Sequence, residues 1–407
     1  MAQQQILGLD IGSETIKAVI AEQTSDGKIL LKAGFRRPSR GMRKGVVVDM
    51  ENATSAVTGL LDKVREVSKN APRNIYLRVG GSDVRVQSSR GITAVSRANS
   101  EIYKDDIDRV REASQALNLP HNREVLHTII REFIVDGVGD IQDPLGMVGA
   151  RLEVLSLIID AFQPTIKNLS KCVELAGGSI GGLVFGPLAS ASTLLTNNQK
   201  ELGIVLIDIG YGTTGIAVYE ENKLLHTRVF PVGAGHITND LAIALKIPVE
   251  VAEKVKLSFG YASSRGTSGK EKIDLQKIDS KVKGSPTRKF VAEVIESRLS
   301  EICDLINSDL RAIEKERSLP AGVVVTGGGA KLPGVADLFK DELKLATQIG
   351  FPKDGIFETE SQAMLEFLES PEYSLVLGLI LSSQKTQNRR ISVNGSKLSK
   401  FLKNLIP

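Results

Sequence analysis

The feature that most constrains the fold of this chain is a β-hairpin pattern that occurs twice. An apolar strand over 6–11 leads through a glycine turn to a second strand over 16–21, and the same arrangement returns at 203–209 and 215–219. Each turn carries Asp-x-Gly, which suits a tight turn between two strands. Two such hairpins about 200 residues apart predict a duplicated fold, in which a cleft separates two similar halves and one turn lies on each side.

Length and composition agree with an α/β protein of more than one domain. A chain of 407 residues is too long for one compact core, and its 42% hydrophobic and 25% charged residues are ordinary globular values. Apolar residues at helical spacing predict helices over 52–69, 164–176 and 286–317, between the strands. The polar segments 261–283 and 382–396 are expected to be a loop-rich excursion and a flexible linker.

Several classes of function are excluded by what the sequence lacks. Trp is absent and no basic stripe carries interleaved aromatic residues, so we expect no nucleic-acid partner. Cys172 and Cys303 are far apart and have no CxxC or CxxH spacing, which argues against a disulfide framework or a zinc site. We expect no export signal at the N-terminus, and no membrane-spanning helix, because no apolar run reaches the length of a bilayer.

The two hairpin turns are candidate phosphate-binding sites. Glycines let the backbone approach a phosphate, and successive N–H groups at a tight turn form an anion-binding concavity. Asp10 and Asp208 would hold a hydrated Mg²⁺ through water. One such turn is equally well explained as an ordinary glycine turn, but two turns across a cleft could hold the β- and γ-phosphates of a nucleotide from both sides. The predicted phosphate-binding residues are Gly12, Ser13, Glu14, Thr15 and Lys17 in the first turn, and Gly210, Tyr211, Gly212, Thr213 and Thr214 in the second.

A third glycine element completes a nucleotide-binding pattern. A buried strand over 323–326 runs into three glycines, where bare backbone can lie against a flat ligand. Two Asp-x-Gly turns followed by a triple glycine resemble the signature of the actin, Hsp70 and sugar-kinase superfamily. This resemblance implies an actin-like fold that binds ATP with Mg²⁺ and lays the triple glycine against the adenosine. The predicted adenosine-binding residues are Gly327, Gly328, Gly329 and Ala330, together with Glu253 and Lys256, for which a solvated helix of alternating charge is nearly as good an explanation.

Further motifs narrow the resemblance to one family. In the first half they are Asp-Asp-Ile-Asp-Arg-Val at 105–110, Arg-Glu-Val-Leu-His at 123–127, Phe-Ile-Val-Asp-Gly at 133–137, Asp-Pro-Leu-Gly-Met at 143–147 and Arg-Leu-Glu at 151–153. In the second half they are His-Ile-Thr-Asn-Asp-Leu-Ala at 236–242, Glu-Val-Ile-Glu-Ser-Arg at 293–298 and Leu-Pro-Ala-Gly at 319–322. With these motifs nearly the whole chain resembles the FtsA family of bacterial cell-division proteins.

The resemblance implies a subdomain layout, a function and partners. The subdomains would be a first core subdomain over 1–85 and 163–195, an insert absent from actin over 86–162, a second core subdomain over 196–242 and 306–383, and an outer subdomain over 243–305, followed by a linker over 384–396 and a membrane-targeting helix over 397–407. The protein would polymerise at the division site on the cytoplasmic face of the membrane and tether filaments of the tubulin-like FtsZ. The insert would contact other division proteins, and the outer subdomain would grip the C-terminal peptide of FtsZ. Arg288, Lys289 and Arg298 are candidate peptide contacts, and a solvated basic helix face is an equal alternative.

Three positions depart from the superfamily pattern and bear on ATP hydrolysis. Gly186 lies where Hsp70-type ATPases carry a glutamate that orients the attacking water, Gly215 replaces a common aspartate, and Tyr211 replaces a glycine. Without a group that positions water, hydrolysis is expected to be slow, and we assign no catalytic residue. His127 is expected to be structural. A small-molecule kinase of the same fold and a pilus-assembly adaptor are the alternative functions, but neither explains the C-terminal segment.

The last eleven residues carry the pattern of an amphipathic helix. Their apolar residues repeat at i, i+3, i+4, i+7 and i+8, no acid is present, and Ser396 is a candidate N-cap. A helix this short is marginal in water, so a surface must fold it. The protein's own body is one such surface, and an anionic membrane suits the lysines better. The predicted membrane contacts are Lys397, Leu398, Lys400, Phe401, Leu402, Lys403, Leu405 and Ile406.

Overall fold

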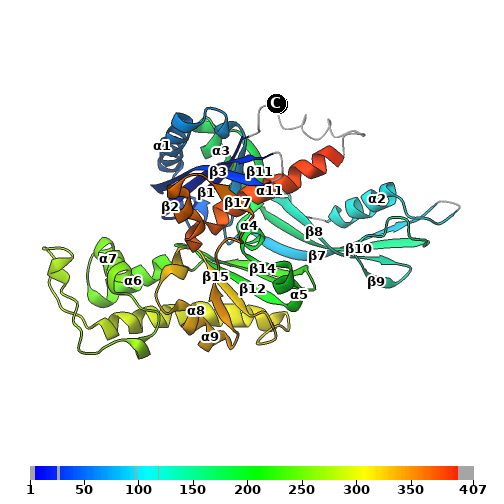
Figure 1. Ribbon diagram of the computed structural model, residues 1–407. Coiled ribbons are helices and arrows are strands. Elements are labelled where there is room, and N and C mark those ends of the chain that lie inside the picture. Colours follow the sequence, from blue (N-terminus) through cyan, green and yellow to red (C-terminus); the bar gives the residue numbers. More distant parts are fainter. Residues whose placement is uncertain (1–4, 25–27, 97–98, 118, 393–407) are drawn as a thin grey trace.

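The computed structural model describes residues 5–24, 28–96, 99–117 and 119–392. Two α/β halves lie against each other, and a separate four-stranded sheet projects away from them (Figure 1). The predicted membrane-targeting helix over 397–407 lies outside the described residues.

The first half is built on a six-stranded sheet. Strands β1, β2 and β3 form an antiparallel meander, and β6 and β11 extend the sheet beyond β1 in parallel. Helices cover both faces, because the central strands are apolar on both sides. In spatial order the strands are β11 (Ile180–Phe185), β6 (Ile75–Val79), β1 (Gln5–Ile11), β2 (Thr15–Gln23), β3 (Ile29–Pro38) and β17 (Phe357–Thr359).

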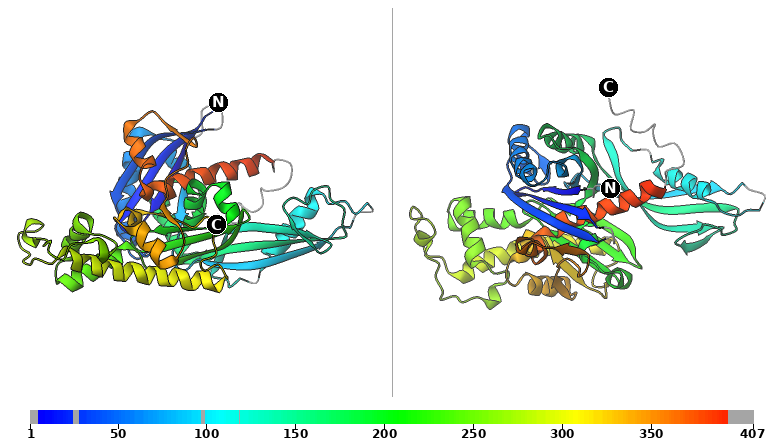
Figure 2. Two further views of the ribbon diagram at one scale, coloured as in Figure 1. Left: turned by 60° about the horizontal axis from the view of Figure 1, so that its bottom comes forward. Right: turned by 45° about the horizontal axis from the view of Figure 1, so that its top comes forward.

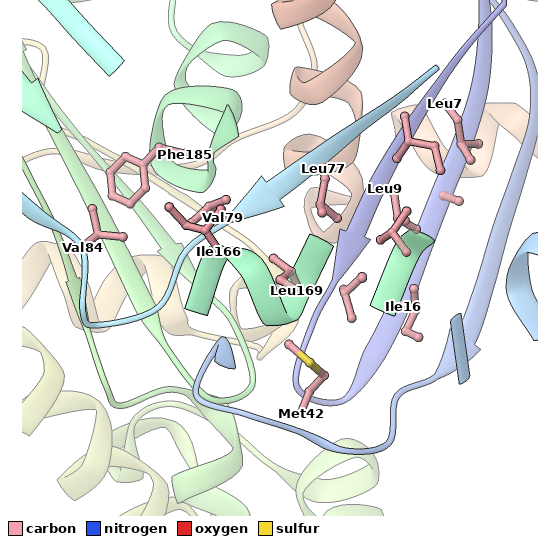
Figure 3. Close-up of a cluster of buried hydrophobic side chains, with 14 of the residues drawn as sticks. Leu7, Leu9, Ile16, Met42, Leu77, Val79, Val84, Ile166, Leu169 and Phe185 are labelled. Atoms are coloured by element: carbon pink, nitrogen blue, oxygen red, sulfur yellow. The ribbon is translucent and has the colours of Figure 1, made fainter. Parts of the chain in front are cut away.

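Helices α1 (Met50–Val67) and α3 (Gln163–Leu175) cover one face of this sheet. Figure 3 shows Leu9 and Leu77, from neighbouring strands, in one buried cluster with Leu169 of α3. Helix α1 begins after Asp49, whose carboxylate accepts the backbone N–H of Asn52 and so satisfies one unpaired donor of the first turn. Both helices lie within two residues of the predicted ranges.

The second half repeats the topology of the first. Strands β12, β13 and β14 form the antiparallel meander, and β15 and β16 extend it in parallel, in the same order as β1, β2, β3, β6 and β11. The duplicated α/β fold predicted from the two hairpins is therefore confirmed. In spatial order the strands are β14 (Lys223–Phe230), β13 (Thr214–Glu220), β12 (Ile204–Ile209), β15 (Val323–Thr326) and β16 (Thr347–Ile349).

The longest helix of the second half is α8 (Arg288–Ala312), whose apolar stripe packs into the core beside β12 and β15. It ends before the predicted residue 317, because Glu314 and Arg317 take positive φ angles of 58° and 57° and turn the chain. The polar segment 261–283 holds two single-turn 3₁₀ helices, η2 (Ser264–Gly266) and η3 (Leu275–Lys277), as its loop-like composition predicted. The other helices of this half are α5 (Asn197–Leu202), α6 (Ala234–Leu245), α7 (Val249–Phe259), η4 (Gly328–Lys331) and α9 (Val335–Leu343).

The projecting sheet is formed by the strands between residues 85 and 162, with helix α2 (Lys104–Gln115) packed on it (Figure 2). Its small core contains Ile102, Val110, Phe133 and Leu152. In spatial order the strands are β7 (Arg85–Ala94), β10 (Arg151–Phe162), β8 (Arg123–Val135) and β9 (Val138–Ile141). Among the residues that the structure describes, this sheet shares no strand with either half.

The C-terminal part of the chain returns to the first half, which corrects the assignment of 306–383 to the second core subdomain. Strand β17 pairs with β3, and α11 (Ser374–Ser392) packs against the face of the first sheet opposite α1. Two glycines allow this packing: a Cβ on Gly8 would lie 2.7 Å from the carbonyl oxygen of Val376, and one on Gly378 would lie 2.0 Å from that of Ala189 in α4 (Gly186–Leu194).

Helix α11 also corrects the start of the predicted flexible linker. The helix extends to Ser392, so the segment 384–392 is helical, and 393–396 lies outside the described residues. The helix continues into this polar stretch because no proline occurs between Pro371 and Pro407 to end it. The remaining short elements are β4 (Met42–Arg43), β5 (Val46–Val47), η1 (Ala71–Arg73), α10 (Gln362–Leu368) and η5 (Pro371–Tyr373).

Candidate functional site: a cleft between the two halves

The two hairpin turns have the same backbone geometry. In the first, the N–H of Gly12 donates to the carbonyl oxygen of Thr15 at 3.1 Å, and in the second, the N–H of Gly210 donates to that of Thr213 at 2.9 Å. Glycine is needed at the first of these positions because a Cβ on Gly12 would lie 2.7 Å from that carbonyl oxygen. Each turn leaves its remaining N–H groups free of the strand ladder, as an anion-binding turn requires.

The turns face each other across one cavity of about 310 Å³. They approach so closely that a Cβ on Gly212 would lie 2.8 Å from Ser13 Oγ on the opposite side. Two of the residues predicted to bind the nucleotide do not line the cavity: Thr214 is buried and donates to the carbonyl of Val232 at 2.8 Å, and Ala330 is buried in the core of the second half. The predicted residues that do line it are Asp10, Gly12, Ser13, Glu14, Thr15, Lys17, Asp208, Gly210, Tyr211, Gly212, Thr213, Glu253, Lys256, Gly327, Gly328 and Gly329.

The triple glycine forms one wall of the cavity, and its glycines differ in how much room a side chain would have. Gly327 has φ +85°, and a Cβ there would lie 2.4 Å from Asp208 Oδ1. A Cβ on Gly328 would meet nothing within 4 Å, so its bare backbone faces open space. Leu257, Leu332 and Pro333 add apolar surface to the same cavity. An open glycine wall with apolar neighbours suits a flat, largely apolar ring.

The two carboxylates at the strand ends lie on the floor of the cavity. Burial raises the pKa of Asp208, while the hydroxyl of Ser190, which donates to its Oδ2 at 2.8 Å, counteracts that rise. Among the described residues no group of three or more potential metal ligands occurs. Mg²⁺ is commonly held by one or two carboxylates, with water and substrate phosphate completing its shell, so Asp10 and Asp208 fit this ion in the company of a nucleotide.

Glu253 and Lys256 belong to a hydrogen-bonded group at the rim of the cavity. The ammonium of Lys256 donates to Glu253 Oε2 at 2.7 Å and to Thr238 Oγ1 at 2.8 Å, and it lies 5.7 Å from the ring centre of Tyr211. Burial, followed by the charges of Glu14 and Glu253, raises the pKa of Tyr211 to about 12. The solvated-helix alternative for Glu253 and Lys256 does not fit Lys256, which is 6% exposed.

Sequence reasoning missed Glu372, which gathers three cations at the edge of the cavity. Its carboxylate accepts from Lys331 at 2.8 Å and lies 3.6 Å from Lys17 Nζ and 3.8 Å from Arg36 Nη1. Burial would raise the pKa of Glu372, but the hydrogen bond from Lys331 and the charges of Lys17 and Arg36 lower it. Lys17 therefore lines the cavity with its ammonium already paired. No sequence pattern marked Glu372, because its partners come from β2, β3 and η4.

Comparison with known proteins assigns the family. The family model described as "Cell division protein FtsA" matches residues 205–378, and that described as "SHS2 domain inserted in FTSA" matches 81–159. The cell division protein FtsA of Pseudomonas aeruginosa is 32% identical over 398 residues, which cover 97% of this chain and 94% of that protein. The chain belongs to the FtsA family of cell-division proteins. FtsA of Bacillus subtilis (strain 168) is 36% identical over 346 residues, which cover 85% and 78% of the two chains.

Solved structures agree with the actin-like fold of this FtsA-family chain. A chain of the PilM–PilN type IV pilus biogenesis complex superposes with a TM-score of 0.66 at 20% identity and covers 93% of this chain and 98% of its own. MreB5 of Spiroplasma citri bound to AMPPNP gives 0.55 at 16% identity, covering 97% and 99%. At these identities the likeness shows the fold alone.

Other predicted residues of the FtsA-family chain lie away from the cleft. His127 Nε2 accepts the backbone N–H of Phe185 at 3.0 Å, so this histidine links the projecting sheet to β11. Arg298 pairs with both carboxylate oxygens of Asp240, at 2.7 and 2.9 Å, and Arg288 lies 3.3 Å from the carboxylate of Glu271. Within the described part of the chain, no helix is long and apolar enough to cross a membrane.

Proposed function

We propose that this FtsA-family protein binds ATP and Mg²⁺ in the cleft, polymerises on the cytoplasmic face of the membrane at the division site, and tethers FtsZ filaments there. The observation that carries ATP binding is the convergence of both phosphate turns and the triple glycine on one cavity. MreB5, which has the same fold, was solved with AMPPNP. Asp10 and Asp208 would hold Mg²⁺ through water, and Glu253, Lys256 and the glycine wall would hold the adenosine.

ATP would act as an assembly ligand and be consumed slowly. Gly186 at the start of α4 supplies no side chain that could orient an attacking water, and a Cβ there would lie 3.1 Å from Arg78 Nε. Since positioning of the water is a large part of phosphoryl-transfer catalysis, the cleft is better equipped to bind ATP than to hydrolyse it.

The segment 397–407 would attach the protein to the membrane. A single helix of this size binds an anionic surface weakly and reversibly. Copies held in a row along a filament raise the effective concentration of the remaining helices, so a polymer would bind far more tightly than a monomer. Polymerisation and membrane attachment would then support each other.

Liposome co-sedimentation with ATP tests the membrane attachment. We expect the full chain to pellet with anionic vesicles and less with neutral ones, and a chain that ends at Ser396 to stay in the supernatant. A matched pair separates the apolar face from the rest of the helix: Phe401→Ser should reduce pelleting several-fold, and Asn404→Ser, on the polar side, should not. Equal pelleting of the full and shortened chains would show that this segment is not the anchor.

Two surfaces would bind protein partners. In the subdomain proposed at 243–305, the exposed apolar residues Ile243, Leu257 and Phe290 lie on α6, α7 and α8 respectively. Helix α8 also carries the basic residues Lys289 and Arg298. An acidic, apolar peptide such as the C-terminus of FtsZ fits this composition. On the insert proposed at 86–162, Val138, Leu145, Met147 and Val148 are exposed and suit contacts with other division proteins or a neighbouring copy.

Fluorescence polarisation with the FtsZ C-terminal peptide tests the first surface. Because Arg298 and Arg288 already pair with carboxylates of this chain, their loss would also disturb the fold, and exposed Lys289 is the better probe. Lys289→Glu should weaken peptide binding about tenfold, and Lys63→Glu, an equal charge change at an exposed position of α1, should leave it unchanged. Equal peptide affinities for both variants would show that the peptide does not bind this helix face.

A further inference from the structure

A largely buried arginine that the sequence analysis did not single out, Arg78, also lines the cleft. Arg78 is near the end of β6, between the parallel strands β1 and β11. The register pairs Leu77 with Leu9, so Arg78 is level with Asp10, at the edge where the carboxyl ends of these strands meet. The matching position of the second half is Thr326, paired with Asp208. Its hydroxyl donates to the carbonyl of Pro371 at 2.9 Å, so at this pair of matching positions the first half supplies a cation and the second half does not.

The hydrogen-bonding capacity of Arg78 is barely used. Its side chain is 14% exposed, one nitrogen lies 3.4 Å from Asp10 Oδ1, and another lies 3.4 Å from the carbonyl oxygen of Gly80. Its Nε is buried without a partner. A guanidinium has five N–H donors, and a structural pair with a carboxylate is normally short and bidentate. Arg298 on Asp240, at 2.7 and 2.9 Å, shows what such a pair looks like in this molecule.

Two glycines leave space for this guanidinium beside the phosphate turns. A Cβ on Gly80 would lie 2.9 Å from Arg78 Nε, and a Cβ on Gly186 would lie 3.1 Å from the same atom. The slot between these glycines limits where the guanidinium can lie. The same side chain lines the cavity together with Gly12, Gly210 and Thr213.

We propose that Arg78 binds the terminal phosphate of the nucleotide that the two turns hold, and that it supplies positive charge there in addition to that of Mg²⁺. Asp10 would keep the guanidinium in place, and the unused donors would point to the phosphate oxygens. Because ADP lacks the γ-phosphate, Arg78 would distinguish ATP from ADP. This inference rests on the proposed binding of ATP.

Equilibrium binding of ATP and of ADP, by isothermal titration, with Mg²⁺ and separately with EDTA, tests the role of Arg78 on the full chain. Arg78→Gln should weaken ATP binding roughly 10- to 100-fold, as expected for loss of charge-assisted hydrogen bonds, and change ADP binding much less. The loss should be larger in EDTA, where the arginine would be the nearer source of charge. Arg78→Lys should fall between the two, because it keeps the charge and loses the planar fork.

Arg36→Gln is the matched control, since Arg36 lines the same cavity but its side chain is 51% exposed. It should change the affinities for ATP and ADP by one common factor. If Arg78→Gln and Arg78→Lys leave the ratio of ATP to ADP affinity as it is in the unaltered chain, the proposal is wrong. Should Arg78→Gln fail to fold, as judged by its thermal melt without nucleotide, Arg78→Lys alone decides. An unaltered chain that binds neither nucleotide would instead refute ATP binding itself, and the role of Arg78 with it.

Discussion

Glu372→Gln removes a carboxylate that joins the two halves at the edge of the cleft, since its partners Lys17 and Arg36 belong to the first half and Lys331 to the second. Lys331 and Arg36 are about half exposed, and pairs of this kind contribute about 0–1 kcal/mol each. The pair with Lys17 is buried, with side-chain exposures of 11% and 7%, and loss of one partner of a buried pair costs about 3–5 kcal/mol.

Two features of the site reduce that cost. Gln keeps an acceptor oxygen, and Lys17 keeps its 3.0 Å hydrogen bond to the backbone carbonyl of residue 372. We therefore expect Glu372→Gln to lower the free energy of unfolding by about 2 kcal/mol at pH 7. The urea midpoint at constant slope measures it. Lys331→Ala, which removes only an exposed partner, is the control and should cost about 1 kcal/mol or less.

The effect should depend on pH in a defined direction. Because the folded protein holds the pKa of Glu372 below its ordinary value of 4.5, the stabilisation is fully present above that pH and is lost as the pH falls through the folded value. The difference between the unaltered chain and Glu372→Gln should therefore shrink below pH 4.5. A difference of the same size at pH 7 and pH 3.5, or none at pH 7, would refute the reasoning.

Three further substitutions test the cleft and its supports. Gly327→Ala should lower the free energy of unfolding by about 2–5 kcal/mol, because it adds a Cβ at positive φ, 2.4 Å from Asp208 Oδ1. Gly328→Ala, whose Cβ would meet open space, should change it by no more than about 0.5 kcal/mol, and comparable thermal melts for the two variants would contradict this. Ser190→Ala should lower the free energy of unfolding by about 1–3 kcal/mol at pH 7 and by less in acid, because it removes the hydroxyl donor from the buried carboxylate of Asp208. A urea midpoint that does not move would argue against that hydrogen bond. His127→Ala should also lower the free energy of unfolding by about 1–3 kcal/mol, because it leaves a buried backbone N–H of β11 unpaired, and it should not change nucleotide affinity. A loss of ATP binding without a loss of stability would instead place this histidine in the site.

The repeated hairpin predicted the duplicated α/β fold, and together with the triple glycine it predicted most of the residues that line the cleft. Local backbone geometry is encoded locally: a turn that returns the chain after four residues needs glycine where a Cβ would meet a carbonyl oxygen, as at Gly12. Two copies of that geometry required two similar halves, and the cavity is lined by nearly all of the residues that these turns and the triple glycine supplied. Thr214 and Ala330 lie beyond the cavity because each stands where its strand or turn enters the core.

The structure alone decided where distant segments meet. Nothing in the polar stretch after residue 380 or in the sequence around β17 indicated that the chain returns to the first half, because that packing depends on room left by Gly8 and Gly378 on elements far apart in sequence. Glu372 and Arg78 were missed for the same reason. A single charged residue acquires its role from partners on other strands, and a sequence pattern records spacing along the chain but not proximity across it. The sequence therefore determined the backbone that surrounds the cleft, and the tertiary structure determined which charges face one another within it.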